Sequence, residues 1–135
     1  MTHQLVTVTN DSYINAESVC ELLRKLATVV TTTPITLVLD NARYQRCKLV
    51  EDCAITLGIE LLFLPPYSPN LNIIERLWKF TKRKCLYSRY YETFADFKTA
   101  IITCLSNTDT KYRKELDSLL ALNFQEFKEV QVLAR

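Results

Sequence analysis

Two acidic residues, Asp40 and Glu75, stand in surroundings that suit chemistry. Asp40 ends the apolar run ITLVLD, and Glu75 lies within the proline-rich stretch LFLPPYSPNLNIIERLW. Carboxylate oxygens are preferred ligands of Mg²⁺ and Mn²⁺, and a pair of such ions about 3.5 to 4 Å apart promotes phosphodiester cleavage. The two acids therefore predict a metal-dependent site that acts on nucleic acid.

Both carboxylates also have a simpler interpretation. Asn72 is a good helix N-cap, and Glu75 would then occupy the third helical position, where acids commonly stabilise a helix without binding a ligand. Asp40 could likewise cap a helix that runs from 42 to 57. From the residues alone, both alternatives stay open.

Basic residues gather close to each acid. On a helix that carries Glu75 they would lie along a phosphate backbone, where each contact releases counterions. The alternative is an ordinary solvated helix face. Trp78 is expected in the core. The predicted DNA-binding residues are Arg43, Arg46, Arg76, Lys79, Lys82 and Arg83.

The elements that must position these residues follow from hydrophobic periodicity. Residues 35–40 and 59–64 are short and apolar, which is typical of buried strands, and helical spacing lies between them. A strand, a helix and a strand in so short a stretch predict a parallel pair with both faces covered. Further segments are a strand at 4–8 and helices at 15–30, from 73, from 93, and around Leu116 to Phe124.

Composition limits the remaining possibilities. The chain has 135 residues, of which 48% are hydrophobic, so it can form one domain with its own core. Its net charge of +2 says little about partners. Five cysteines form no CxxC pair and are expected to be reduced core thiols. Neither a membrane span nor a signal peptide is evident, so a cytoplasmic, nucleoid-associated protein is expected.

The segments LVLDNARYQ and LFLPPYSPNLNIIERLW resemble the catalytic domain of mariner-type bacterial insertion-sequence transposases, which are DDE superfamily endonucleases. The resemblance covers about residues 10 to 107. It implies a partial catalytic domain over 1–107, with 108–135 as a helical extension of the same domain. The implied fold is α/β, a ribonuclease H-like mixed sheet with flanking helices. Asp40 matches the second and Glu75 the third acid of a triad that binds two Mg²⁺ or Mn²⁺ ions.

The resemblance is incomplete at the N-terminus. The family's first Asp lies on a first strand upstream of the matched region, so we expect the fold to be truncated there, and Asp11 does not suit that role. Residues 35–40 would then have an open edge, filled by 4–8 or by a neighbouring chain, or else the protein would be poorly soluble.

These expectations lead to two functional hypotheses. The first is a transposase fragment for DNA cleavage and strand transfer at insertion-sequence ends, completed by an upstream-encoded part. The alternative is a non-catalytic remnant that binds DNA or associates with intact transposase. Insertion-sequence ends, target DNA and a homo-oligomer are the expected partners, with no membrane.

Overall fold

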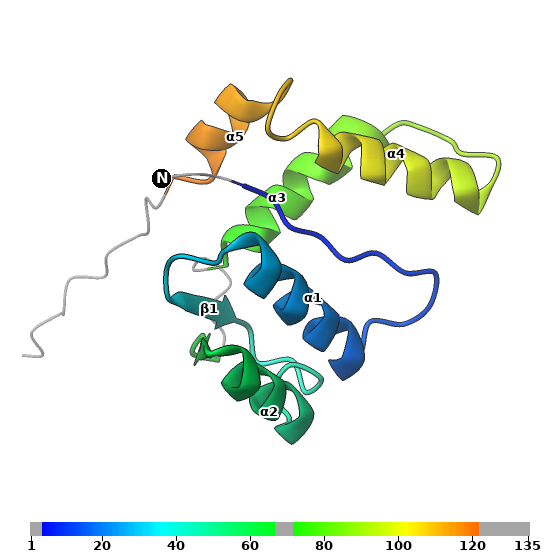
Figure 1. Ribbon diagram of the computed structural model, residues 1–135. Helices are drawn as coiled ribbons and strands as arrows, with labels where there is room; N and C mark the ends of the chain where they lie inside the picture. The colour runs from blue at the N-terminus through cyan, green and yellow to red at the C-terminus, as the bar shows by residue number, and fades with distance from the viewer. Residues whose placement is uncertain (1–3, 67–71, 122–135) are drawn as a thin grey trace, which may run out of the picture.

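The computed structural model describes residues 4–66 and 72–121, and it shows helices around a small parallel sheet (Figure 1). This mixed α/β architecture is compatible with a ribonuclease H-like fold. The elements are α1 (Ala16–Val29), β1 (Ile35–Leu39), α2 (Lys48–Leu57), β2 (Ile59–Phe63), α3 (Ile73–Thr81), η2 (Lys82–Leu86), α4 (Phe94–Ser106) and α5 (Arg113–Leu119).

The predicted strand–helix–strand unit is confirmed. β1 and β2 are parallel and in register from Ile35 opposite Ile59 to Leu39 opposite Phe63. Gly58 alone separates α2 from β2, and its φ of 66° is the left-handed conformation that glycine adopts without strain. Its N–H closes the helix on the Ala54 and Ile55 carbonyls. The register of the sheet therefore depends on a one-residue connection.

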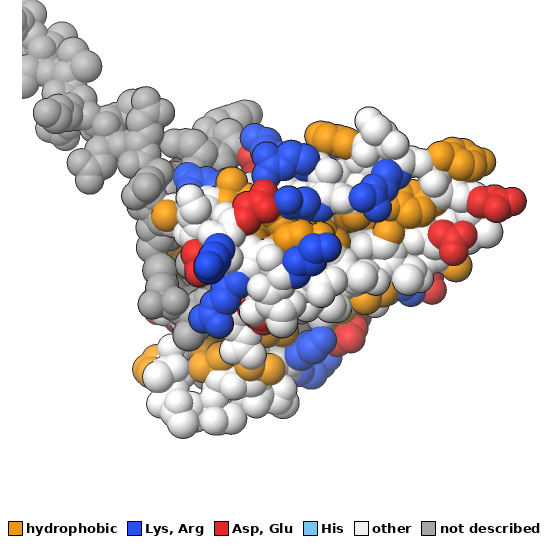
Figure 2. All heavy atoms as spheres, turned by 90° about the horizontal axis from the view of Figure 1, so that it is seen from above, with side chains coloured by type: hydrophobic (Ala, Val, Ile, Leu, Met, Phe, Trp, Pro, Cys, Tyr) orange, Lys and Arg blue, Asp and Glu red, His pale blue; other side chains and the backbone are white. Residues whose placement is uncertain are grey.

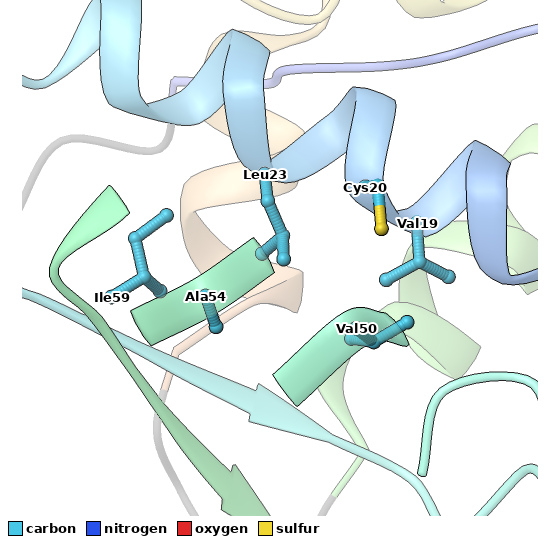
Figure 3. Packing of buried hydrophobic residues seen from close by; sticks show 6 residues of the cluster. All are labelled: Val19, Cys20, Leu23, Val50, Ala54 and Ile59. Atoms are coloured by element: carbon cyan, nitrogen blue, oxygen red, sulfur yellow. The ribbon is translucent and has the colours of Figure 1, made fainter. Parts of the chain in front are cut away.

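A first hydrophobic cluster joins α1 and α2 to one face of the sheet (Figure 3). Leu23 and Val50 are fully buried at its centre. Alternate strand residues Ile35, Leu37 and Leu61 pack against it, as the period of two in a strand requires. This cluster holds the strand from which Asp40 emerges.

A second cluster joins α3, η2, α4 and α5. Phe80 is 1% exposed, and its ring meets Tyr112 edge-on at 5.4 Å. After α3 the chain continues as one wide turn, in which the Tyr87 N–H donates to the Lys82 carbonyl at 2.9 Å. The Thr81 hydroxyl donates to the Leu77 carbonyl, and hydroxyls bonded in this way often bend helices. The hydrophobic pattern gave no sign of this turn.

The prediction of a strand at 4–8 is wrong. Residues 4–10 carry no strand and pair with neither β1 nor β2. Lys25 donates to the Thr7 carbonyl at 2.7 Å, and Leu5 packs on the second cluster. The segment runs between α1 and the layer of α3 and α4 (Figure 1), so it links the two clusters.

The helix predicted over 42–57 begins six residues late, at Lys48. Residues 42–46 form a turn instead, in which the Gln45 and Arg46 N–H groups both donate to the Ala42 carbonyl. Cys47, in an extended conformation, then starts the helix without a side-chain cap. The apolar spacing within the helix is as predicted, with Val50 and Ala54 buried.

The sheet is covered on one face only, so the expectation of two covered faces is wrong. Val38 and Leu62 face each other across the strands and are 52% and 54% exposed. Among the described residues, β1 pairs with β2 alone, which leaves its other edge open. Residues 4–8 do not pair with that edge.

We expect Val38→Lys to reduce self-association of the protein. The lysine places a charge beside an open apolar edge and disfavours edge-to-edge pairing. The free energy of unfolding should change by less than about 0.5 kcal/mol, because the site is exposed. Sedimentation velocity over a concentration series measures the effect. Ile55→Lys, at a 76% exposed position on α2, is the matched control and should change nothing.

The remaining expectations have mixed outcomes. α1, α3 and α4 begin within one residue of their predicted starts, and α5 contains the buried Leu116. Pro69 and Phe124 lie outside the described residues. No described helix has both the length and the apolar character to cross a membrane.

Candidate functional site

Asp40 directly follows β1, at the carboxyl end of the strand, and its side chain is exposed. Its Oδ1 accepts a hydrogen bond of 3.0 Å from the Ala42 N–H. This contact forms a local turn, and since α2 starts only at Lys48, the helix-capping alternative for Asp40 is wrong. Next to it, the Asn41 side-chain amide donates to the Leu64 carbonyl and ties together the ends of the two strands.

Glu75 lies in the first turn of α3 and is also exposed. Asn72 caps the helix as predicted, because its Oδ1 accepts from the Ile74 N–H at 3.0 Å. In α1 the third helical residue, Ser18, bonds back to the N-cap backbone, and Glu75 makes no such bond in α3. Its carboxylate has no partner among the described residues, so helix capping does not use it.

The two acids belong to different hydrophobic clusters. Asp40 follows a strand that packs on the first cluster, and Glu75 lies on a helix of the second cluster. In the sequence, the proline-rich residues 64–72 separate the two acids. No group of three acidic, histidine or cysteine side chains that could hold a metal occurs in the described ranges. Asp11 is engaged elsewhere, in an ion pair of 2.5 Å with Lys98.

The donor atoms suit a hard divalent cation better than a soft one. Asp40 and Glu75 offer carboxylate oxygens, which match Mg²⁺ or Mn²⁺. Both are exposed, and the Ala42 N–H occupies only one of the four lone pairs of the Asp40 carboxylate. The chemistry of the pair fits a metal, while the number of carboxylates is one short of the triad that the resemblance implies.

The five cysteines are free, and Cys20, Cys85 and Cys104 are buried, which agrees with the expected core thiols. Burial, and then the neighbouring Cys53, raises the pKa of Cys20 to about 11. Burial and the neighbouring Cys85 do the same for Cys104. These two thiols therefore stay protonated at neutral pH and are poor nucleophiles.

Several of the predicted DNA-binding residues lie on the protein surface, on α3 or η2 or in the turn of residues 42–46. Lys79 and Arg43 are exposed and have no partner among the described residues. The Lys82 ammonium lies over the Trp78 ring at 5.8 Å, and Arg46 lies over the Phe63 ring at 5.4 Å. Seen from above, basic side chains gather over one face of the molecule around a few acidic ones (Figure 2).

Arg76 has a structural role that the sequence did not indicate. Its Nη1 donates to the Ala121 carbonyl at 2.9 Å and to the Leu119 carbonyl at 3.5 Å. Carbonyls at a helix C-terminus lack partners within the helix, and a guanidinium there also interacts favourably with the helix dipole. Arg76 thus joins α3 to the end of α5, and only a tertiary contact could reveal this.

Trp78 is not a core residue, contrary to expectation. Its side chain is 47% exposed, and Ile74, one turn earlier, is 64% exposed. Helix α3 buries a neighbouring stripe instead, made of Leu77, Phe80 and Thr81. The apolar positions of α3 are too numerous for one contact face, so periodicity did not identify which stripe is buried.

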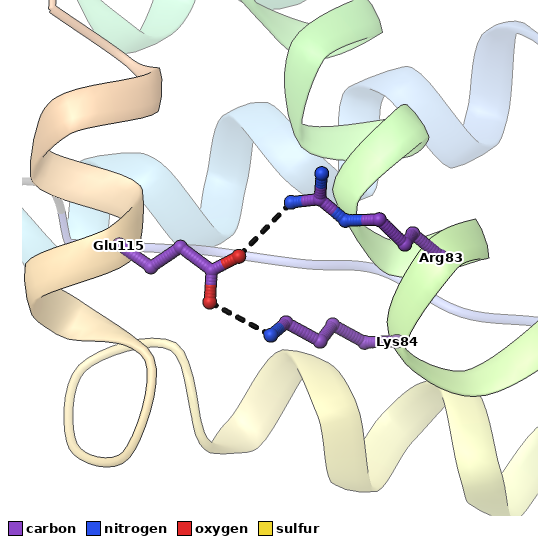
Figure 4. A network of polar contacts seen from close by, with 3 residues as sticks. All are labelled: Arg83, Lys84 and Glu115. Atoms are coloured by element: carbon purple, nitrogen blue, oxygen red, sulfur yellow. Dashed lines mark hydrogen bonds and ion pairs between the residues drawn. The ribbon is translucent and has the colours of Figure 1, made fainter.

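Glu115 on α5 holds two cations of the basic surface (Figure 4). Arg83 Nη2 lies 2.9 Å from its Oε1, and Lys84 Nζ lies 2.7 Å from its Oε2. The hydrogen bond from Lys84, with the charges of Lys84 and Arg83, lowers the pKa of the Glu115 carboxyl. The carboxylate therefore keeps its charge to lower pH than an unpaired glutamate does, and the contact weakens as the pH falls through the lowered pKa.

We expect Glu115→Gln to increase the affinity for duplex DNA. The change leaves Arg83 and Lys84 without their counter-charge, and each additional phosphate contact contributes about threefold at moderate salt. Fluorescence anisotropy at two salt concentrations measures the affinity. Glu21→Gln, which removes an exposed carboxylate from α1, is the control. Unchanged affinity and salt dependence in Glu115→Gln would show that Arg83 and Lys84 do not contact DNA.

Comparison with known proteins adds the family to this geometry. Residues 1–98 match the family model of the DDE superfamily endonucleases. The chain belongs to this family. DDE domains of the transposase type act on DNA, and the superfamily generally uses divalent metal ions. This DDE-family chain is also 40% identical over 42 residues to an uncharacterised protein, y4pE/y4sA, of Sinorhizobium fredii. The match spans 31% of each protein, so the chain covers under a third of that relative.

Proposed function

We propose that this DDE-family chain supplies Asp40 and Glu75 to a metal-dependent site that cleaves and joins DNA at the ends of a mariner-type bacterial insertion sequence. One observation carries the proposal. Both acids are exposed and outside any described ion pair, one at the end of a parallel strand and the other in the first turn of a capped helix. Carboxylates that are open to solvent keep lone pairs available for a hard divalent cation.

Asp40 and Glu75 would hold the divalent ions. Such ions activate the attacking oxygen and stabilise charge on the phosphate and the leaving oxygen. The chain's own part is positioning. The Ala42 N–H orients the Asp40 carboxylate, and the Asn72 cap sets the direction from which Glu75 leaves its helix.

Exposed cations would hold the DNA on either side of the site. Arg43 and Arg46 follow Asp40 in sequence, and Lys79, Lys82 and Arg83 follow Glu75 along α3 and η2. Contacts of this kind position the backbone without reading its sequence. Arg76 is committed to α5, so its contribution to DNA binding is smaller than that of its neighbours.

The first acid of the triad is proposed to come from residues other than these 135. The open edge of β1 offers backbone groups to a further strand, which could carry that acid beside Asp40. Either an upstream segment or a separate polypeptide could provide it. Cleavage then depends on that strand being present.

Titration with Mn²⁺ tests the metal site without relying on activity. The wild-type chain should bind Mn²⁺ weakly, and both Asp40→Asn and Glu75→Gln should lower that affinity. Asp52→Asn, at an exposed position on α2, is the control and should bind as wild type does. Binding that survives in both site variants would overturn the proposed metal pair.

A second candidate is favoured because, among the described residues, no group of three acidic, histidine or cysteine side chains could hold a metal. The chain would then bind DNA or associate with intact transposase without catalysis. Mixing it with a polypeptide that supplies the first strand separates the two functions. Restored cleavage of an insertion-sequence end supports the first, and DNA binding without cleavage supports the second.

A further inference from the structure

The turn between η2 and α4, which we call the tyrosine turn (residues 87–94), exposes large aromatic side chains. Tyr90 is 90% exposed, Tyr87 is 63% exposed and Phe94 is 62% exposed. Within the described ranges, neither Tyr87 nor Tyr90 contacts another ring. The turn stands at the outer end of α4 (Figure 1), so both tyrosine rings are open to solvent.

The backbone beneath these rings is held firmly. The Tyr91 hydroxyl donates to the Cys85 carbonyl, and its ring meets Phe97 edge-on at 6.0 Å. The Arg89 N–H donates to the Leu86 carbonyl at 3.3 Å, and Thr93 caps α4 through the Asp96 N–H. Ser88, between the two exposed tyrosines, has a φ of 58°, in the left-handed region. Tyr91 faces inward as the anchor, while Tyr87 and Tyr90 face outward.

The charge around the turn is positive. From Lys82 to Phe94 the sequence KRKCLYSRYYETF holds four basic residues and one acid, Glu92. Glu115 on α5 offsets Arg83 and Lys84 together, so part of the positive charge is left. Arg89, between the two tyrosines, is exposed. Exposed aromatic rings beside cations that lack a counter-charge suit the binding of a polyanion that also presents flat, apolar faces.

We propose that the tyrosine turn binds unpaired bases of single-stranded DNA, with Tyr87 and Tyr90 stacking on bases and Arg89 contacting the backbone. Bases in a duplex hide their faces against each other, so only unpaired bases offer a surface to these rings. The inference rests on the proposed action on DNA and adds a preference for unpaired strand next to the cleaved end.

Fluorescence anisotropy tests the proposal with a short thymine-rich single strand and a duplex of equal length, both in EDTA. Tyr90→Ala and Tyr87→Ala should each weaken single-strand binding roughly tenfold, within the range known for base stacking. Duplex affinity should stay unchanged. Tyr90→Phe keeps the ring and should bind as wild type does. Tyr13→Ala removes a tyrosine that is 91% exposed near α1, and should change neither affinity.

Each outcome decides one question. Equal losses for single strand and duplex in Tyr90→Ala would overturn base stacking, and so would unchanged single-strand binding. If Tyr90→Ala instead changes only the sedimentation coefficient, the turn is a protein interface and the proposal fails. If Lys79→Ala weakens duplex binding, the proposed function stands even when Tyr90→Ala overturns base stacking. If the wild-type chain binds neither the single strand nor the duplex, the proposed function itself is overturned.

Discussion

Asp40→Asn is expected to reduce metal-dependent DNA cleavage at least about a hundredfold, since even partners of metal ligands cost ten- to a hundredfold when changed. The amide keeps the shape of the side chain, and its oxygen still accepts from the Ala42 N–H, so the turn after β1 should persist. The loss would therefore reflect the missing negative charge. The measurement is nicking of a duplex insertion-sequence end, in Mg²⁺ or Mn²⁺, with the first strand supplied in trans.

The control for this variant is Asp52→Asn, which removes one exposed carboxylate from α2. It should cleave as wild type does. Full cleavage by Asp40→Asn would show that this acid holds no essential metal. Robust cleavage by the 135-residue chain alone, abolished by Asp40→Asn, would instead place the first acid within these residues.

Phe80→Ala is expected to lower the free energy of unfolding by about 3 to 5 kcal/mol, as truncation of a buried phenylalanine generally does. Phe80 is 1% exposed, its ring meets Tyr112 edge-on, and the Lys84 ammonium lies 5.4 Å from the centre of the ring. A loss of this size is a large part of the stability of a small domain. Urea denaturation, followed by circular dichroism, measures it.

Phe94→Ala is the matched control for this loss. It removes the same side chain from a position that is 62% exposed, so the change should stay below about 1 kcal/mol. Equal losses in the two variants would mean that the second cluster does not depend on Phe80. If the slope of unfolding free energy against urea concentration differs between variants, the variant has altered compactness rather than altered stability.

Local signals in the sequence predicted much of the fold. The apolar runs at 35–40 and 59–64 and the glycine at 58 were enough for the parallel strand pair and its connection. Asn72 was enough for the start of α3. Each of these features depends on residues close together in the chain, so pattern and propensity could identify it.

The errors arose where a distant contact decided the outcome. Residues 4–8 are rich in β-branched side chains, as strands often are, but within the described chain their contacts are with Lys25 and the second cluster. Trp78 has the periodicity of a core residue, yet α5 and α4 pack against another stripe of the same helix. Arg76 looks like a DNA contact in sequence and binds the end of α5.

The candidate site was predicted in its parts and not in its assembly. The types and local contexts of Asp40 and Glu75 follow from the sequence, as does the capped start of the helix that carries Glu75. These residues do not determine which strand pairs with the other edge of β1. The position of a third acid depends on that strand.

The order of the two clusters along the chain has a consequence for how the protein is made. The first cluster uses residues from Ala16 to Leu61, and the second uses residues from Leu77 to Leu120 together with Leu5. Short sequence separations favour fast folding, and domains form as they are synthesised. Strand β1, which Asp40 follows, should therefore fold before α3 emerges from the ribosome. Leu5 can pack only after α5 has formed. Pulsed hydrogen exchange during refolding should accordingly protect β1 and α2 first and the amides beside Leu5 last.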